Sequence, residues 1–189
     1  MSKLQLLCVP WMISPSTPHL GVSTKSFDGV NHGFVTFMGF FGQRTKGESL
    51  YGQYRQVAVI LEGIVGVRMY PEFSPVDSER LESYDWEAVP EFRDEDGSLK
   101  NHGRRFDEQW SNSDICPNPA AYIVEDSDWL RQLRFTPDAP PHLRFQHYLF
   151  VGDDFNVEVI AKSWKWEIVG SDVESPSVAS SVESGNARA

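Results

Sequence analysis

Apolar and polar residues alternate most regularly between Arg144 and Val169. An alternation with a period of two is typical of a β-strand, because successive side chains point to opposite faces. The first run has one face made of Phe145, His147, Leu149 and Val151. Gly152-Asp153-Asp154 then interrupts the run with residues that favour turns, and a second alternating run follows at once. The segment therefore predicts a long β-hairpin.

The phase of the second run changes after Ala161. Its apolar positions are Phe155, Val157, Val159 and Ala161 before the change, and Trp164, Trp166 and Ile168 after it. An extra residue near Lys162-Ser163 would explain the change as a β-bulge. Alternatively, the strand leaves one sheet at this point and enters another. Both interpretations remain open from the sequence.

Shorter patterns predict the rest of the fold. Strands are expected at Leu4–Val9, Phe34–Phe41, Gln56–Leu61, Ile64–Tyr70 and Ala121–Val124. A short helix is expected at Trp129–Leu133, with Asp126-Ser127-Asp128 as its cap and with Trp129, Leu130 and Leu133 facing the sheet. Gly66, inside a strand, suggests a bulge or a close backbone approach. These elements predict an α+β, mainly β fold: a twisted antiparallel sheet, open or curled into a half-barrel, with one short helix.

The segment from Pro71 to Pro119 differs from its surroundings. It is rich in proline and charge, yet it also contains Trp86, Phe92, Phe106 and Trp110. We expect a long insert at 71–119 that covers the sheet as an extended flap, with a ligand pocket between Trp86 and Trp110 as one use for it. Residues 1–170 are expected to form one domain, and residues 171–189, which lack aromatic residues, a disordered tail.

Charge and composition narrow the function. The net charge of −10 and the pI of about 4.9 argue against a nucleic-acid partner, because no basic stripe is present. Cys8 and Cys116 are too few for a disulfide framework or a cysteine-rich zinc site and are interpreted as reduced thiols. No apolar run has membrane-spanning length. We therefore expect an acidic cytoplasmic protein without a cofactor.

Candidate catalytic residues lie in the hairpin. The sequence contains no nucleotide-binding glycine loop, nucleophile elbow or zinc-binding His-Glu-x-x-His motif. If the protein is an enzyme, His147 with Asp153 or Asp154 are its candidate acid and base. The simpler interpretation is a hydrogen-bonded core histidine and two turn residues. No metal site is predicted.

The order of motifs from Asp126 onward carries a resemblance. Asp-Ser-Asp-Trp-Leu is followed by His147-Tyr148, the acidic pair Asp153-Asp154, the run Val157–Ala161 and Trp-Lys-Trp. This order resembles the C-terminal halves of small uncharacterised bacterial proteins, some of which look like immunity proteins for polymorphic toxins. The resemblance implies a bacterial cytoplasmic protein that acts by binding another, toxin-like protein.

Three functions are consistent with these observations. The first is a non-catalytic interaction protein, in particular an immunity protein. The alternative is a small-molecule-binding protein or hydrolase-like enzyme with its site under the 71–119 insert and with His147 in that site. The third is a structural subunit, which would expose an apolar patch and form oligomers. The sequence predicts no particular oligomeric state.

Overall fold

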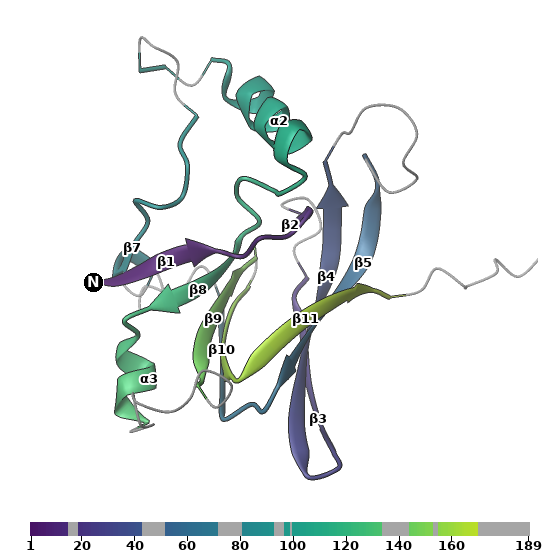
Figure 1. The fold of residues 1–189 in the computed structure, drawn as a ribbon, viewed down its shortest axis with the longest axis vertical. Helices are drawn as coiled ribbons and strands as arrows, with labels where there is room; N and C mark the ends of the chain where they lie inside the picture. The colour runs from purple at the N-terminus through teal and green to yellow at the C-terminus, as the bar shows by residue number, and fades with distance from the viewer. Residues whose placement is uncertain are drawn as a thin grey trace, which may run out of the picture.

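A computed structural model describes residues 1–14, 19–42, 52–71, 81–92, 97–98, 100–133, 144–152 and 155–169. Most of these residues belong to strands (Figure 1). The strands are β1 (Ser2–Leu6), β2 (Trp11–Ile13), β3 (Gly21–Phe27), β4 (Val30–Phe41), β5 (Tyr54–Glu62), β6 (Gly66–Pro71), β7 (Tyr84–Asp85), β8 (Ala121–Glu125), β9 (Gln146–Val151), β10 (Phe155–Ala161) and β11 (Ser163–Ile168). The helices are α2 (His102–Ser113) and α3 (Asp128–Gln132).

The strands form two sheets. The first has the order β6-β10-β9-β8-β1-β7, and the second has the order β11-β5-β4-β2 with β3 also paired to β4. Every pair is antiparallel except β1 with β7. The second sheet is strongly twisted and curls like a half-barrel (Figure 1). The predicted α+β, mainly β fold is therefore confirmed, with two sheets in place of one.

The change of phase after Ala161 is a change of sheet. β9 and β10 form the expected hairpin in the first sheet, with Asn156 opposite Val151 and Ala161 opposite Gln146. The chain then crosses to the second sheet, where β11 pairs with β5. β5 and β6 make the same crossing in the opposite direction, since β6 pairs with β10. The bulge alternative is wrong, and the two crossing segments form a bent two-stranded ribbon shared by both sheets.

Both faces of the β9–β10 hairpin are buried. Tyr148, Phe150, Val157 and Val159 face the core between the sheets. The opposite face contributes Leu149 to a second, smaller cluster, which also includes Tyr84 and is joined at its margin by Trp86. Residues 81–92 thus cover the outer face of the first sheet. Strands buried on both faces leave little room for unpaired polar side chains, so every polar residue on them needs a partner.

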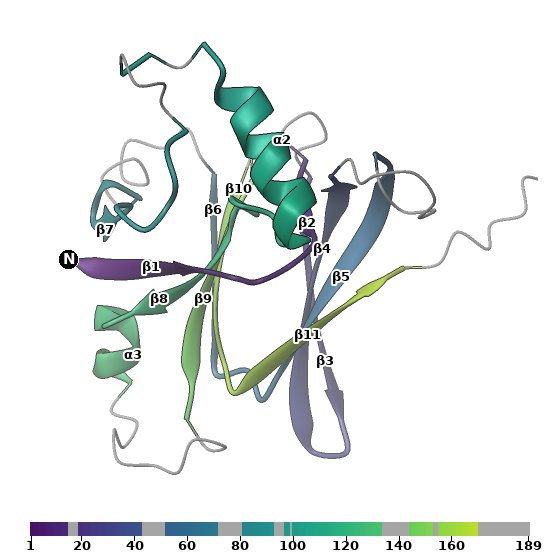
Figure 2. The same ribbon diagram turned by 45° about the horizontal axis from the view of Figure 1, so that its top comes forward.

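Four elements were not predicted: β2, β3, β7 and α2. α2 (Figure 2) lies inside the 71–119 segment, where an extended flap was expected. Its Trp110 packs against Phe40 at the end of β4. β3 is mostly exposed and has no buried apolar face. Its sequence therefore lacks the alternation from which a strand could have been predicted. It reaches β4 through Asp28-Gly29, which both have positive φ (49° and 75°), as the tight turn of a two-residue hairpin requires. The tail predicted at 171–189 lies outside the described residues.

Candidate functional site

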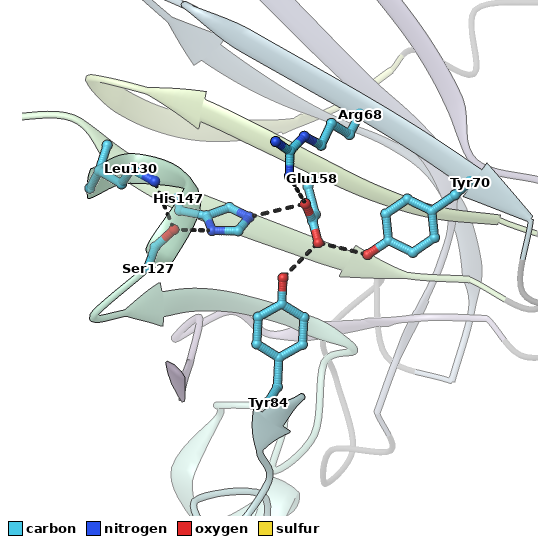
Figure 3. A network of polar contacts seen from close by, with 7 residues as sticks. All are labelled: Arg68, Tyr70, Tyr84, Ser127, Leu130, His147 and Glu158. Atoms are coloured by element: carbon cyan, nitrogen blue, oxygen red, sulfur yellow. Dashed lines mark hydrogen bonds and ion pairs between the residues drawn. The ribbon is translucent and has the colours of Figure 1, made fainter. Parts of the chain in front are cut away.

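A buried carboxylate lies on the outer face of the first sheet, on the strand next to the edge strand β6 (Figure 3). Glu158, on β10, has 0% exposure. Its Oε1 accepts hydrogen bonds from the hydroxyl groups of Tyr70 (2.8 Å) and Tyr84 (2.6 Å). Tyr70 lies on the neighbouring strand β6, whereas Tyr84 is brought in by β7 from the covering segment. Glu158 therefore fastens residues 81–92 to the sheet.

Two nitrogen donors face the other oxygen of Glu158. Nη1 of Arg68 lies 3.8 Å and Nε2 of His147 lies 3.6 Å from Oε2. Arg68 is directly opposite Glu158 in the β6–β10 pair, and its guanidinium lies 3.8 Å from the ring centre of Trp129 on α3. Both distances to Oε2 exceed ordinary hydrogen-bond length, so these are electrostatic contacts. With the two hydroxyl donors, they favour the ionised form of Glu158 against the cost of its burial.

His147 links this cluster to the start of α3. Its Nδ1 lies 2.8 Å from Oγ of Ser127, which is the N-cap and accepts a hydrogen bond from the backbone N–H of Leu130 (3.1 Å). The Asp126-Ser127-Asp128 cap is thus confirmed, and Trp129 packs edge-on against His147 as well as on Arg68. Leu133, which was expected to face the sheet, is 37% exposed. It follows the last residue of the short helix, so it is not held against the sheet.

The chain Ser127–His147–Glu158 contains the residue types of a hydrolytic triad. Its environment is that of a fold-stabilising network. The three residues have only 3%, 2% and 0% exposure, and the Ser127 oxygen already caps a helix. An attacking serine needs an open path to the substrate carbonyl and donors for the oxyanion. In this arrangement the three groups orient one another and hold α3 against the first sheet.

A small polar pocket ends on this network. Its volume is about 180 Å³, and its walls include Arg68, Ser83, Tyr84, Ser127, Trp129 and His147. Three of these residues, Arg68, Tyr84 and His147, also contact Glu158. The pocket is smaller than the roughly 300–1,000 Å³ of sites for drug-sized ligands. It can therefore admit only a small molecule.

Only some of the residues that the sequence analysis singled out lie in this site. His147 is inside the network, and its carboxylate neighbour is Glu158. Asp153 and Asp154 lie outside the described residues. Trp86 packs on Tyr122 of the first sheet, whereas Trp110 packs on Phe40 beside the second sheet, so the two tryptophans belong to different surfaces. The aromatic residues that line the pocket are Tyr84 and Trp129.

Sequence reasoning missed Glu158, Arg68, Tyr70 and Tyr84. Glu158 lies between Val157 and Val159 in the sequence, and this alternation suggests that its side chain faces solvent. A signal was present, since its neighbour Ile160 on the same face is apolar and indicates that this face is covered. The partners come from distant segments, which no local pattern can connect. In the described part of the chain, no three His, Cys, Asp or Glu side chains gather as a metal site would require.

A second surface feature is the free edge of β6. This strand is at the margin of the first sheet, and within the described residues its outer edge is not paired with another strand (Figure 2). Val65, just before it, and Val67 and Met69 within it are 43%, 37% and 46% exposed. The intervening Arg68 turns to the opposite face, toward Glu158 and Trp129. Among the residues that the structure describes here, the edge thus presents apolar side chains, and the charge of Arg68 lies on the other face.

The fold and site define a two-sheet, mainly β protein with a glutamate-centred polar network under a covering segment. Comparison with family models, curated protein sequences and solved structures found no match. None of the helices in the described residues is both long and apolar enough to cross a membrane.

Proposed function

We propose that this protein is a non-catalytic interaction protein that binds a strand of another protein along β6. The observation that carries this proposal is the free edge of β6 with the exposed side chains of Val65, Val67 and Met69. An edge strand offers a row of backbone donors and acceptors to an incoming strand. Apolar side chains at alternate positions add contacts that can select a particular partner.

In the described part of the chain, the edge of β6 has none of the usual forms of protection against pairing with another strand. Natural sheets usually shield an edge with charged side chains, with proline inside the strand, or with a bulge. In β6 the one charged residue, Arg68, is held by Glu158 and Trp129, and Pro71 is the last residue of the strand. The edge is therefore suited to pairing.

The burial of Ser127, His147 and Glu158 also supports a binding function over the hydrolase-like alternative. The resemblance to immunity-like bacterial proteins suggests that the partner is a toxin. We accordingly propose a toxin as the first partner to test, and the product of an adjacent gene is the natural choice.

The proposal is tested with variants of the exposed edge. The wild-type protein is expected to bind the toxin candidate with a measurable Kd in calorimetry. Val67→Lys places a charge on the edge and is expected to weaken binding at least tenfold. Ile115→Lys alters a residue of similar exposure (42%) outside β6 and serves as the matched control.

Urea unfolding of all variants separates lost binding from lost stability. Equal affinities of the wild type and Val67→Lys for a bound partner would refute the β6 edge as the interface. An enzymatic turnover that survives without any protein partner would refute the interaction function itself.

A further inference from the structure

We propose that the strand bound by β6 runs antiparallel to it and is held by the backbone N–H and C=O groups of Val67 and Met69. Its residues opposite these two are apolar, and the residue between them is uncharged. The inference rests on the proposed function of the β6 edge and specifies the chemistry of the segment that binds there. That segment belongs to a different protein, since the edge does not fit a second copy of this chain.

The register of the first sheet decides which backbone groups of β6 point outward. The N–H of Gly152 donates to the carbonyl of Phe155 (3.0 Å), so the backbone groups of Phe155 point toward β9. The direction of these groups alternates along an antiparallel strand. Those of Asn156, Glu158 and Ile160 therefore point toward β6.

In β6 the residues opposite these three are Tyr70, Arg68 and Gly66, and their backbone groups point back toward β10. The N–H and C=O groups of Val67 and Met69 point the other way, where no strand of the described part of the chain lies. An antiparallel strand would form a pair of hydrogen bonds with each of these two residues. Antiparallel pairing is also the arrangement of β6 with β10 and is slightly more stable per residue than parallel pairing.

Both ends of β6 limit the site to a short segment. The N–H of Val65 already donates to the carbonyl of Ile160 (3.0 Å). Pro71, at the other end, has no N–H to offer. The core of the bound segment is therefore a residue opposite Val67, a residue opposite Met69 and the one between them.

The exposed side chains of Val67 and Met69 select apolar residues at the two outer positions. They are 37% and 46% exposed. Directly opposite residues in an antiparallel pair carry their side chains on the same face, with Cβ atoms about 5 Å apart. Apolar side chains at these positions would remove the surface of Val67 and Met69 from water.

The charges on the other face favour an uncharged residue at the middle position, which lies opposite Arg68. The guanidinium of Arg68 is countered by the buried carboxylate of Glu158 on β10. Asp128, which lines the same pocket as Arg68, is paired with Arg131. A further charge of either sign would therefore lack a counter-charge, whereas threonine suits an edge strand without one.

A second copy of this chain does not fit the edge. A two-fold pairing centred on Arg68 would set the two Arg68 side chains directly opposite each other, which is destabilising. A pairing centred on Val67 would place Met69 opposite Val65, whose N–H is already used. A pairing centred on Met69 would place Val67 opposite Pro71, which has no N–H.

The test is a titration of the full chain, observed by NMR of its backbone amides, with the peptide Thr-Val-Thr-Val-Thr capped at both ends. The amide signals of Val67 and Met69 are expected to shift along a saturable curve. The same peptide with both valines N-methylated cannot donate to β6 and is expected not to bind. Peptides with lysine or glutamate as the middle residue are expected to bind at least threefold more weakly.

Two variants of one residue separate the backbone from the side chain. Met69→Pro removes an N–H that points away from β10, a position at which an edge strand tolerates proline. It is expected to abolish binding of Thr-Val-Thr-Val-Thr. Met69→Ala, the matched control, keeps the N–H and is expected to weaken binding only a few-fold. Urea unfolding checks that both variants fold, and the N-methylated peptide tests the same hydrogen bonds on the wild-type chain if Met69→Pro does not.

A nitroxide label on the N-terminus of the peptide tests the direction of the strand. Antiparallel pairing places this end beside Tyr70, so the label is expected to broaden the amide signal of Tyr70 more than that of Gly66. Stronger broadening of Gly66 would mean parallel pairing and would overturn the inference.

Other results would overturn it as well. Absence of a saturable shift with Thr-Val-Thr-Val-Thr, or equal binding of its N-methylated form, would show that the edge does not pair with a strand. Equal or tighter binding of a charged peptide would contradict the uncharged middle residue. A dimer of the free protein that Met69→Pro dissociates would make a second copy the occupant. None of these results alters the effect of Val67→Lys on toxin binding, so the failure of the inference is distinguishable from the failure of the proposed function.

Discussion

At the scale of single residues, the burial of Glu158 depends on four residues drawn from three strands. Tyr70 and Arg68 come from β6, Tyr84 from β7, and His147 from β9. Each neighbour offers a hydrogen or a positive charge to the carboxylate. The free-energy cost of burying a charged group is offset only by such partners. Loss of the Glu158 carboxylate is therefore expected to lower the stability of the protein markedly.

Replacement of Glu158 tests this dependence. Glu158→Leu leaves two tyrosine hydroxyls without their acceptor and removes the carboxylate that faces Arg68 and His147, so it is expected to lower the free energy of unfolding by about 3 kcal/mol. Glu158→Gln keeps an acceptor oxygen, so a smaller loss of about 1 kcal/mol is expected. Urea unfolding measures both values. Equal losses would show that hydrogen bonding to the carboxylate contributes little.

The two cysteines are expected to differ in reactivity. Cys8 is exposed, whereas Cys116 is buried, and burial raises the pKa of its thiol to about 12. Since the thiolate is the reactive form, a thiol reagent at pH 8 is expected to modify Cys8 alone. Peptide mapping by mass spectrometry after brief labelling identifies the site. Labelling of Cys116 as fast as Cys8 in the folded protein would contradict the structure.

At the scale of elements, the sequence predicted best those strands that carry a clear hydrophobic pattern of their own. The alternation in β9 and β10 predicted their hairpin, and the near-continuous apolar run in β5 predicted a central strand. β3 escaped prediction because its side chains are mostly exposed, and its pairing depends on a turn and on β4. In α2, the spacing of Phe106 and Trp110 was present but was masked by the prolines around it.

The candidate site was less predictable than the strands. His147 could be identified because it interrupts an apolar face. Its partners could not, since Arg68 and Glu158 meet only through the pairing of β6 with β10, and Tyr84 arrives from the covering segment. A change of sheet after Ala161 was one of two explanations of the phase change, and only the pairing of β11 with β5 decides between them.

Two glycines give a matched test of element packing. A methyl group at Gly66 would lie 2.7 Å from Cζ2 of Trp129, whereas one at Gly103 in α2 would meet nothing within 4 Å. Gly66→Ala is therefore expected to destabilise the protein by about 1–3 kcal/mol through overpacking. Gly103→Ala is expected to stabilise it by up to about 1 kcal/mol, because alanine favours helices. Urea unfolding compares them, and equal effects would show that Trp129 does not press on β6.

At the scale of the whole molecule, the bent ribbon joins the two sheets. The β5–β6 and β10–β11 segments run side by side through both sheets, and the backbone N–H of Lys162 donates to the carbonyl of Glu62 at the crossing (2.9 Å). One apolar core lies between the sheets and takes residues from both. We therefore expect the described part of the chain to unfold as one cooperative unit, so that local ionisation affects global stability.

Alkaline unfolding tests this coupling through three buried acids. Burial raises the pKa of the Cys116 thiol from 9.0 to about 12 and also raises the pKa values of Tyr122 and Tyr148 above their ordinary value of 10.0. Each group is neutral when protonated, so the unfolded chain releases these protons at lower pH than the folded protein. Their contribution to stability is fully present below pH 9 and is lost as the pH rises toward 12 and above.

The free energy of unfolding is accordingly expected to fall above pH 9, by up to about 1.4 kcal/mol per pH unit for each group that ionises only in the unfolded state. Cys116→Ala removes one such group and should make the curve shallower between pH 9 and 12. Cys8→Ala removes an exposed thiol and should leave its slope unchanged. Urea unfolding at a series of pH values measures the slopes. If Cys116→Ala kept the wild-type slope, the thiol would already ionise in the folded protein, which would contradict its burial.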